Sequence, residues 1–183
     1  MKNFIALMLG HYYKTKFKIF NKNIRVGEGL RVYKRLEIQG EGKIAIGKNC
    51  MIRGIRGDPN QHVALYTHDK GATIRIGDNA CLCAARISSK FAVTIGSDVL
   101  VEESGIMDTD FHSINKNRQV PPDEVKEKCE VIIGDRVSVG ARAMITKGVK
   151  IGNDVIVMPG SIVTKSIPSA CTVLGNPAKT VKE

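Results

Sequence analysis

The sequence predicts an all-β protein in which short strands wind into a parallel β-helix, a coil with the cross-section of a triangular prism. From Ile133 onward an aliphatic side chain recurs at every sixth position. These positions are Ile133, Val139, Ile145, Ile151, Val157 and Val163. A small or branched residue follows four places after each, at Val137, Ala143, Val149, Val155, Ser161 and Ile167. Neither a helical period nor strict alternation gives this pattern, whereas three six-residue units of strand and corner close one coil of a prism.

The same phrase returns upstream in pieces. Val26-Gly27, Ile46-Gly47, Ile76-Gly77 and Ile95-Gly96 repeat the aliphatic–glycine pair that also stands at Ile133-Gly134. The register slips between these pieces, so we expect bends or excursions between coils. Stacked coils pair their strands in parallel and bury one another's faces, and such an array needs several coils to be stable.

Length and composition describe one globular domain. The chain has 183 residues, of which 43% are apolar and 5% aromatic, so aliphatic side chains must supply the core. The formal net charge of +10 indicates an anionic partner, and a phosphate-rich cofactor or an acidic saccharide would meet that need as well as nucleic acid would. No nucleic-acid motif or aromatic stacking platform accompanies the basic residues, so we expect no nucleic-acid partner.

Five cysteines are present, at Cys50, Cys81, Cys83, Cys129 and Cys171. An odd number in a chain of this length argues against a disulfide framework and favours a reducing compartment, the cytoplasm. The Cys81-x-Cys83 pair has no second pair at zinc-ligand spacing. We therefore interpret it as packing and expect no metal.

The N-terminal segment, residues 1–23, is expected to cap the β-helix. Its apolar run has the minimum length of a signal sequence but lacks a good cleavage site, and nothing approaches a membrane span. The stretch Phe4–Phe20 combines aromatic side chains with Lys14, Lys16 and Lys18. That mixture leaves peripheral membrane contact open beside the capping role that we favour.

The β-helix is expected over residues 24–168, followed by a C-terminal extension at 169–183. Two stretches interrupt the repeat. Residues 54–71 contain a strong Gly-Asp-Pro-Asn turn signal and show no repeat. Residues 108–130 are polar, carry Pro121-Pro122 and must loop out of the prism. Functional residues concentrate on loops held by a rigid scaffold, so we look for the site at this second interruption.

The phrase from Ile133-Gly134-Asp135-Arg136-Val137 to Gly175-Asn176-Pro177-Ala178-Lys179 resembles the C-terminal half of sugar and maltose O-acetyltransferases. These belong to the hexapeptide-repeat acyltransferase family, and the resemblance covers roughly residues 24–183. It implies a left-handed coil, a homotrimer, acetyl-CoA as co-substrate and a sugar hydroxyl as acceptor. The Asp-x-Asp-Phe-His phrase at 108–112 looks most like members that modify capsule and lipopolysaccharide, which implies a role in surface-polysaccharide synthesis.

His112 is the candidate general base. Moving an acetyl group from a thioester to an alcohol needs a base of near-neutral pKa to take the hydroxyl proton, and histidine supplies one. His112 matches the histidine that the family places in a loop between neighbouring subunits. Asp110 is expected to fix its tautomer and favour the imidazolium, while Asp108 either shares that role or grips sugar hydroxyls. Glu102 and Glu103 stand where aliphatic or small residues would be expected, which makes them candidates for acceptor binding.

The resemblance also implies where the donor lies. The family runs the pantetheine arm of CoA along a groove between two prisms, where small residues let the arm approach the backbone and lysines meet the phosphates. The matching positions are Ala141, Pro159, Gly160, Thr164, Lys165, Lys179 and Lys182. Ser138 departs from the family, in which many members carry tryptophan there, and this leaves the shape of the acceptor pocket open.

Other functions stay as alternatives. The first is an N-acetyltransferase for a nucleotide-linked amino sugar, although such enzymes usually carry an N-terminal nucleotide-binding domain for which this chain has no room. A serine acetyltransferase is disfavoured because the long N-terminal helical domain of that group is missing. A non-catalytic scaffold, or a carbonic-anhydrase-like protein using His62, His68 and His112 as zinc ligands, belongs to a different class. Cys129 could be a nucleophile, but no second histidine is placed to activate it, so direct transfer in a ternary complex is preferred.

Overall fold

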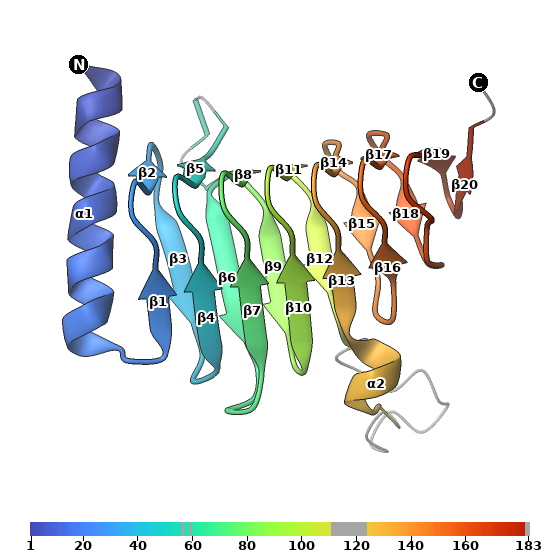
Figure 1. Ribbon diagram of the computed structural model, residues 1–183, viewed down its shortest axis with the longest axis horizontal. Coiled ribbons are helices and arrows are strands. Elements are labelled where there is room, and N and C mark those ends of the chain that lie inside the picture. The colour runs from blue at the N-terminus through green and yellow to red at the C-terminus, as the bar shows by residue number, and fades with distance from the viewer. Residues whose placement is uncertain (56, 59, 111–123, 182–183) are drawn as a thin grey trace.

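The strands of the computed structural model form three parallel sheets, which are the three faces of a prism (Figure 1). The structure describes residues 1–55, 57–58, 60–110 and 124–181. Sheet A contains β1 (Ile24–Val26), β4 (Lys43–Ile46), β7 (Thr73–Ile76), β10 (Ala92–Ile95), β13 (Val131–Ile133) and β16 (Lys150–Ile151). Sheet B contains β2 (Arg31–Val32), β5 (Met51–Arg53), β8 (Cys81–Cys83), β11 (Leu100–Glu102), β14 (Ser138–Val139), β17 (Ile156–Val157), β19 (Thr172–Gly175) and β20 (Ala178–Thr180). Sheet C contains β3 (Leu36–Gln39), β6 (Val63–Thr67), β9 (Arg86–Ser89), β12 (Gly105–Met107), β15 (Met144–Ile145) and β18 (Ile162–Val163).

Each coil contributes one strand to each sheet in the order A, B, C. Strands of successive coils pair in parallel with inward residues in register, as in Ile95 against Ile133 and Val139 against Val157. The last pair, β19 and β20, is antiparallel and ends sheet B. This arrangement buries the aliphatic ladder predicted from the sequence, because all six members from Ile133 to Val163 are at most 2% exposed.

The glycine that follows the inward aliphatic residue has a steric cause. A Cβ atom on Gly77 would lie 2.6 Å from the carbonyl carbon of Gly96 in the next coil, well inside van der Waals contact. The same relation joins Gly96 to Gly134. Successive coils therefore stack backbone against backbone at the corner between sheets A and B, and a side chain there would push them apart.

One expectation about the repeat is wrong. Residues 54–71 do not lack a repeat unit, because Val63–Thr67 forms β6 and pairs with β3 and β9. Val63 and Leu65 are fully buried and Thr67 is 5% exposed, so their alternation continues the inward face of sheet C. A longer corner before β6 displaces this strand from the six-residue register, which hid it in the sequence.

Two helices accompany the coils in the part of the chain that the structure describes. Helix α1 (Lys2–Phe20) covers the open end of the first coil (Figure 1), with Ala6 and Gly10 buried and Tyr13 and Phe17 packed against the core. A Cβ atom on Gly10 would meet the carbonyl oxygen of Leu30, so a small residue is needed at that contact. Helix α2 (Lys126–Cys129) precedes β13. Within the described residues no helix is long and apolar enough to cross a membrane.

Candidate active site

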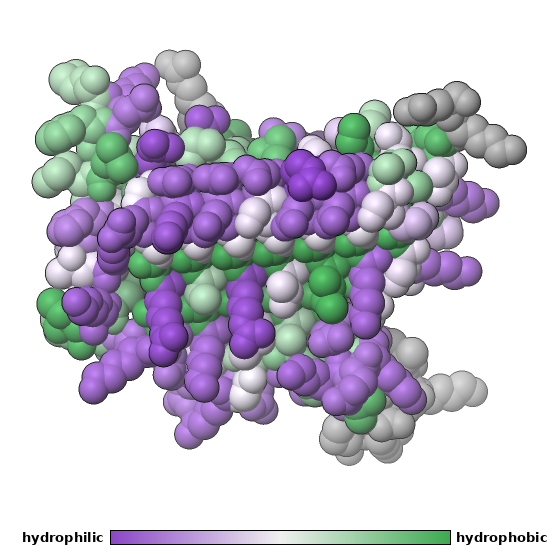
Figure 2. All heavy atoms as spheres, in the orientation of Figure 1, coloured by the Kyte–Doolittle hydropathy of each residue, from purple (hydrophilic) through white to green (hydrophobic). Residues whose placement is uncertain are grey.

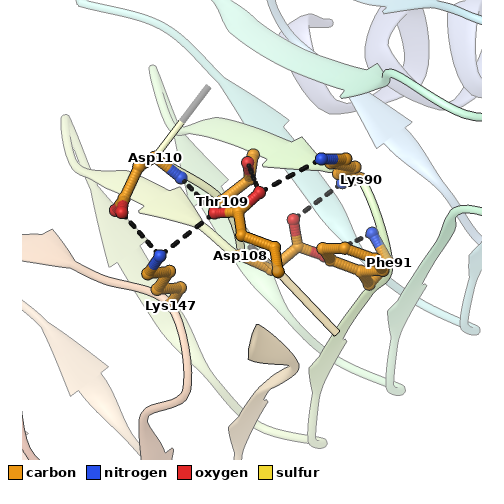
Figure 3. A network of polar contacts seen from close by, with 7 residues as sticks. Lys90, Phe91, Asp108, Thr109, Asp110 and Lys147 are labelled. Atoms are coloured by element: carbon orange, nitrogen blue, oxygen red, sulfur yellow. Dashed lines mark hydrogen bonds and ion pairs between the residues drawn. The ribbon is translucent and has the colours of Figure 1, made fainter. Parts of the chain in front are cut away.

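Asp108 stands where the chain leaves β12 at the corner between sheets C and A. Its side chain is fully buried. The hydroxyl of Ser89 and the backbone N–H of Phe91 donate to Oδ2, at 2.8 and 2.9 Å, and the backbone N–H of Lys90 donates to Oδ1 at 2.7 Å. Figure 3 shows this carboxylate turned toward Lys90 and Phe91. Protein donors occupy both oxygens, so Asp108 holds the corner of the preceding coil here. Its predicted role in acceptor binding stays a prediction.

Glu124 closes the other end of the segment that begins at Asp110, and its side chain is fully buried. Oε1 accepts the backbone N–H of Asp110 at 2.9 Å and lies 3.1 Å from the ammonium of Lys147. Oε2 accepts the hydroxyl of Thr109 at 2.8 Å and lies 3.1 Å from the ammonium of Lys90. The Glu124 carboxylate thus binds the chain at Thr109 and Asp110 and also contacts Lys90 and Lys147, which belong to the preceding and the following coil.

The charged groups of this network shift one another's pKa values. Burial would raise the pKa of the Glu124 carboxyl, but donors from Asp110, Thr109, Lys147 and Lys90 lower it to about 2. Burial would lower the pKa of Lys147, but its contacts with Asp110 and Glu124 raise it. Glu124 is therefore an anion and Lys147 a cation across the physiological range, which makes the network a permanent charge-assisted clamp.

Asp110 is the predicted partner of His112, the candidate general base. Its Oδ2 lies 2.5 Å from the ammonium of Lys147 (Figure 3), and the side chain is 34% exposed. This carboxylate therefore already has a cationic partner from the next coil. His112 lies outside the described residues, as does Lys182, so the predicted pairing of Asp110 with His112 stays a prediction.

A second set of predicted residues meets at the corner between sheets B and C. The backbone N–H of Arg142 donates to the carbonyl of Glu103, and that of Gly160 donates to the carbonyl of Ala141. Glu103, Ala141 and Gly160 thus stack in three successive coils. Glu103 has a φ of 40°, a left-handed corner conformation, and its carboxylate lies 3.7 Å from the guanidinium of Arg142. Pro159 packs against Gly140 in this stack, while Glu102 is exposed at the end of β11.

A groove of about 430 Å³ runs over sheet C from this corner toward the end of β12. Gly105 leaves room in it, because only the methyl of Met144, at 3.9 Å, would contact a Cβ there. Its wall mixes apolar with hydrogen-bonding side chains, namely Tyr66, Arg86, Ser88, Glu103, Met107, Arg142 and Met144. The groove therefore connects Glu103, a predicted acceptor residue, to Met107, which immediately precedes Asp108. No pattern in the sequence marks Tyr66 or Arg86, which belong to earlier coils.

The remaining predicted donor residues lie elsewhere on the prism. Thr164 and Lys165 are exposed at the corner that follows β18, one coil beyond Thr146 and Lys147. Lys179 is exposed on β20, at the end of sheet B. The predicted donor set is therefore divided among the two edges of sheet C and the C-terminal hairpin, and a single chain does not bring its described members into one pocket.

The alternative functions would use His62, His68 and Cys129. Nε2 of His62 lies 2.8 Å from the Glu37 carboxylate, which also accepts the hydroxyl of Tyr66, and hydrogen bonding by His62 is the main reason that the pKa of Glu37 is lowered. His68 is exposed next to β6. Burial raises the pKa of the Cys129 thiol, which disfavours the thiolate that a nucleophile requires.

Comparison with known proteins places the chain in a family. A family model described as bacterial transferase hexapeptide (six repeats) matches residues 130–165. A lipopolysaccharide biosynthesis O-acetyl transferase, WbbJ of Escherichia coli K12, is 30% identical over 154 residues, which are 80% of this chain and 74% of that protein. The chain belongs to the bacterial hexapeptide transferases. The left-handed parallel β-helix and the family membership predicted from the sequence are thereby confirmed.

Further relatives agree with this membership. A 2,3,4,5-tetrahydropyridine-2,6-dicarboxylate N-acetyltransferase of Staphylococcus aureus (strain JH9) is 47% identical over 53 residues, 29% of this chain and 22% of that protein. The solved structure of the polysialic acid O-acetyltransferase OatWY is 25% identical with a TM-score of 0.69, covering 87% of this chain and 74% of that one. The structure of AntD, an N-acyltransferase from Bacillus cereus in complex with dTDP and 3-hydroxybutyryl-CoA, has a TM-score of 0.72 at 19% identity, covering 92% of this chain and 86% of that one, and shares the fold.

Proposed function

We propose that this hexapeptide transferase moves an acetyl group from acetyl-CoA to a hydroxyl of a saccharide, in the synthesis of a surface polysaccharide. The observation that carries the proposal is the groove on sheet C, which reaches Met107, two residues before the Thr109 hydroxyl that Glu124 binds. Aromatic, aliphatic and hydrogen-bonding side chains together are what a sugar face needs. The 30% identity to a lipopolysaccharide O-acetyl transferase over most of both chains supports this acceptor class.

The reaction needs one proton acceptor and one proton donor. The acceptor oxygen attacks the thioester carbonyl while His112 takes the hydroxyl proton, the carbon–sulfur bond then breaks, and the protonated imidazole returns the proton to the CoA thiolate. His112 stands two residues after Asp110, whose backbone N–H is anchored on Glu124. We keep Asp110 as the residue that positions His112. The imidazole of His112 would share the Asp110 carboxylate with the ammonium of Lys147. We assign Glu103 and, at the rim, Glu102 to the acceptor.

For the donor we keep Ala141, Pro159, Gly160, Thr164, Lys165, Lys179 and Lys182. Ala141, Pro159 and Gly160 lie at one edge of sheet C, and Thr164 and Lys165 lie at the other. A donor site that uses both groups requires a second prism against this one. That division supports a homotrimer in which neighbouring subunits complete each site. We place the enzyme in the cytoplasm, because acetyl-CoA is made there and all five cysteines are free.

The deciding experiment replaces His112 by alanine. Turnover on the true acceptor should fall by about 10²–10⁴-fold, while CoA binding and the circular dichroism spectrum persist. Substitution of His68, an exposed histidine next to β6, serves as the matched control and should leave turnover unchanged. Near-native turnover by His112→Ala would refute His112 as the general base.

The second candidate is N-acetylation of an amino group, favoured by the 47% identity to an N-acetyltransferase over 53 residues. A panel of saccharides, matched in pairs that differ by an amino group in place of a hydroxyl, separates the two functions. Transfer to the hydroxyl members supports the first candidate, and transfer restricted to the amino members supports the second.

A further inference from the structure

Helix α1 presents a second apolar face that the fold does not use. Its packing face is formed by Ala6, Gly10, Tyr13 and Phe17, which touch the first coil. The opposite face carries a stripe at spacings of three, four and seven residues, and its side chains are 51–66% exposed. The stripe consists of Phe4, Ile5, Met8, Tyr12 and Ile19. Figure 2 shows hydrophobic surface at the top and at the bottom of the end that α1 forms, with hydrophilic surface between them.

The charges around this stripe have one sign. Residues 2–22 contain five lysines, Lys2, Lys14, Lys16, Lys18 and Lys22, and no aspartate or glutamate. Lys16 and Lys18 lie on opposite flanks of the stripe and are exposed. Lys14 has an acidic neighbour in the first coil, Glu28, at 3.8 Å.

Beside the C-terminal half of α1 the cations surround a hollow of about 300 Å³. The side chains that line it come from α1, the following turn and β1. They are Lys14, Lys18, Lys22, Ile24, Arg25 and Val26, so that among the described residues its wall carries four cations and no carboxylate. A hollow of this kind suits a phosphate group, which lies next to acyl chains in a lipid bilayer.

We infer that the outer face of α1, the stripe with its flanking lysines, docks the enzyme on an anionic membrane surface. Apolar side chains would enter the boundary between head groups and acyl chains, and the lysines would extend toward lipid phosphates. A second copy of the chain is a poor occupant, because two such helices would bring eight lysines together and the helix itself carries no carboxylate to offset them. The docking places the prism with its first coil toward the membrane and leaves the groove on sheet C along its side.

The test uses the full chain and vesicles of two compositions, phosphatidylcholine alone and phosphatidylcholine with about one-third phosphatidylglycerol. The protein should co-sediment with the anionic vesicles and much less with the neutral ones. The double variant Met8→Ser/Tyr12→Ser should weaken this partitioning by at least roughly tenfold. Lys16→Gln and Lys18→Gln should each weaken it by about fivefold and reduce its sensitivity to salt.

Matched controls lie at the far end of the prism. Ile156→Ser removes a side chain that is 48% exposed on β17, and Lys150→Gln removes a cation on β16. Both should partition like the unaltered protein. The inference is overturned if the protein ignores anionic vesicles, or if Met8→Ser/Tyr12→Ser binds them unchanged. It is also overturned if that variant alters the sedimentation mass without vesicles, because the face is then an interface between copies. Turnover on a soluble acceptor should be the same in all of these variants, which separates this test from that of the proposed function.

Discussion

Glu124→Gln is the sharpest test of the clamp that holds the loop ends. The change keeps the volume of the side chain and removes its charge, while four donors still point at it. In the folded protein the pKa of this carboxyl is about 2, against an ordinary value of 4.5. That difference corresponds to roughly 3 kcal/mol of folding free energy at neutral pH.

The sign of the pH dependence follows from the lowered pKa. A carboxyl whose pKa is lower in the folded state contributes its full stabilisation above pH 4.5 and loses it as the pH falls toward 2. The glutamine variant has no such charge to lose. Its deficit against the unaltered protein should therefore be about 3 kcal/mol at pH 7 and shrink to nearly zero at pH 2.

Urea unfolding followed by circular dichroism at pH 7, 4.5 and 2.5 measures this difference, at one protein concentration so that any assembly contributes equally. Glu127→Gln, three residues away on α2 and exposed, is the matched control and should change stability little at any pH. A deficit for Glu124→Gln that stays the same at all three pH values, or one no larger than that of the control, would show that the clamp does not depend on the charge of Glu124.

Three further changes probe other parts of the molecule. Asp108→Ala should destabilise by about 3 kcal/mol in urea unfolding, because it leaves the N–H groups of Lys90 and Phe91 without an acceptor; a loss below about 1 kcal/mol would contradict the role of Asp108 as a corner bond. Gly77→Ala should cost about 1–3 kcal/mol because its Cβ would overlap the backbone of Gly96, whereas Gly71→Ala, whose Cβ would meet Asp69 at an ordinary 3.4 Å, should cost little. Lys165→Ala and Lys179→Ala should each lower the affinity for acetyl-CoA in calorimetry and make that affinity less sensitive to salt. Unchanged affinity in both variants would mean that the donor site lies elsewhere.

The sequence by itself determined the prism and its core. The inward aliphatic residues and the corner glycines repeat over six positions, so a local pattern encodes which side chains point inward. The Asp-x-Asp-Phe-His phrase and the repeats also identified the family, which the comparisons confirm. Glu103 was found as a departure from the repeat, and the structure places it on the wall of the groove.

The tertiary structure alone decided how the loop ends are held and what α1 exposes. Lys90 and Lys147 lie 34 and 23 residues from Glu124 in the sequence, and the three meet because their coils stack in one register. The Asp108 carboxylate likewise accepts hydrogen bonds from Ser89 and Phe91, which lie one coil earlier. An isolated Glu or Lys in a polar stretch carries no sign of its partner, since charge pairing across coils depends on the vertical stacking and not on the local sequence. The apolar stripe of α1 is equally a matter of stacking, because the small residues Ala6 and Gly10 turn one face to the first coil and leave the larger side chains outside.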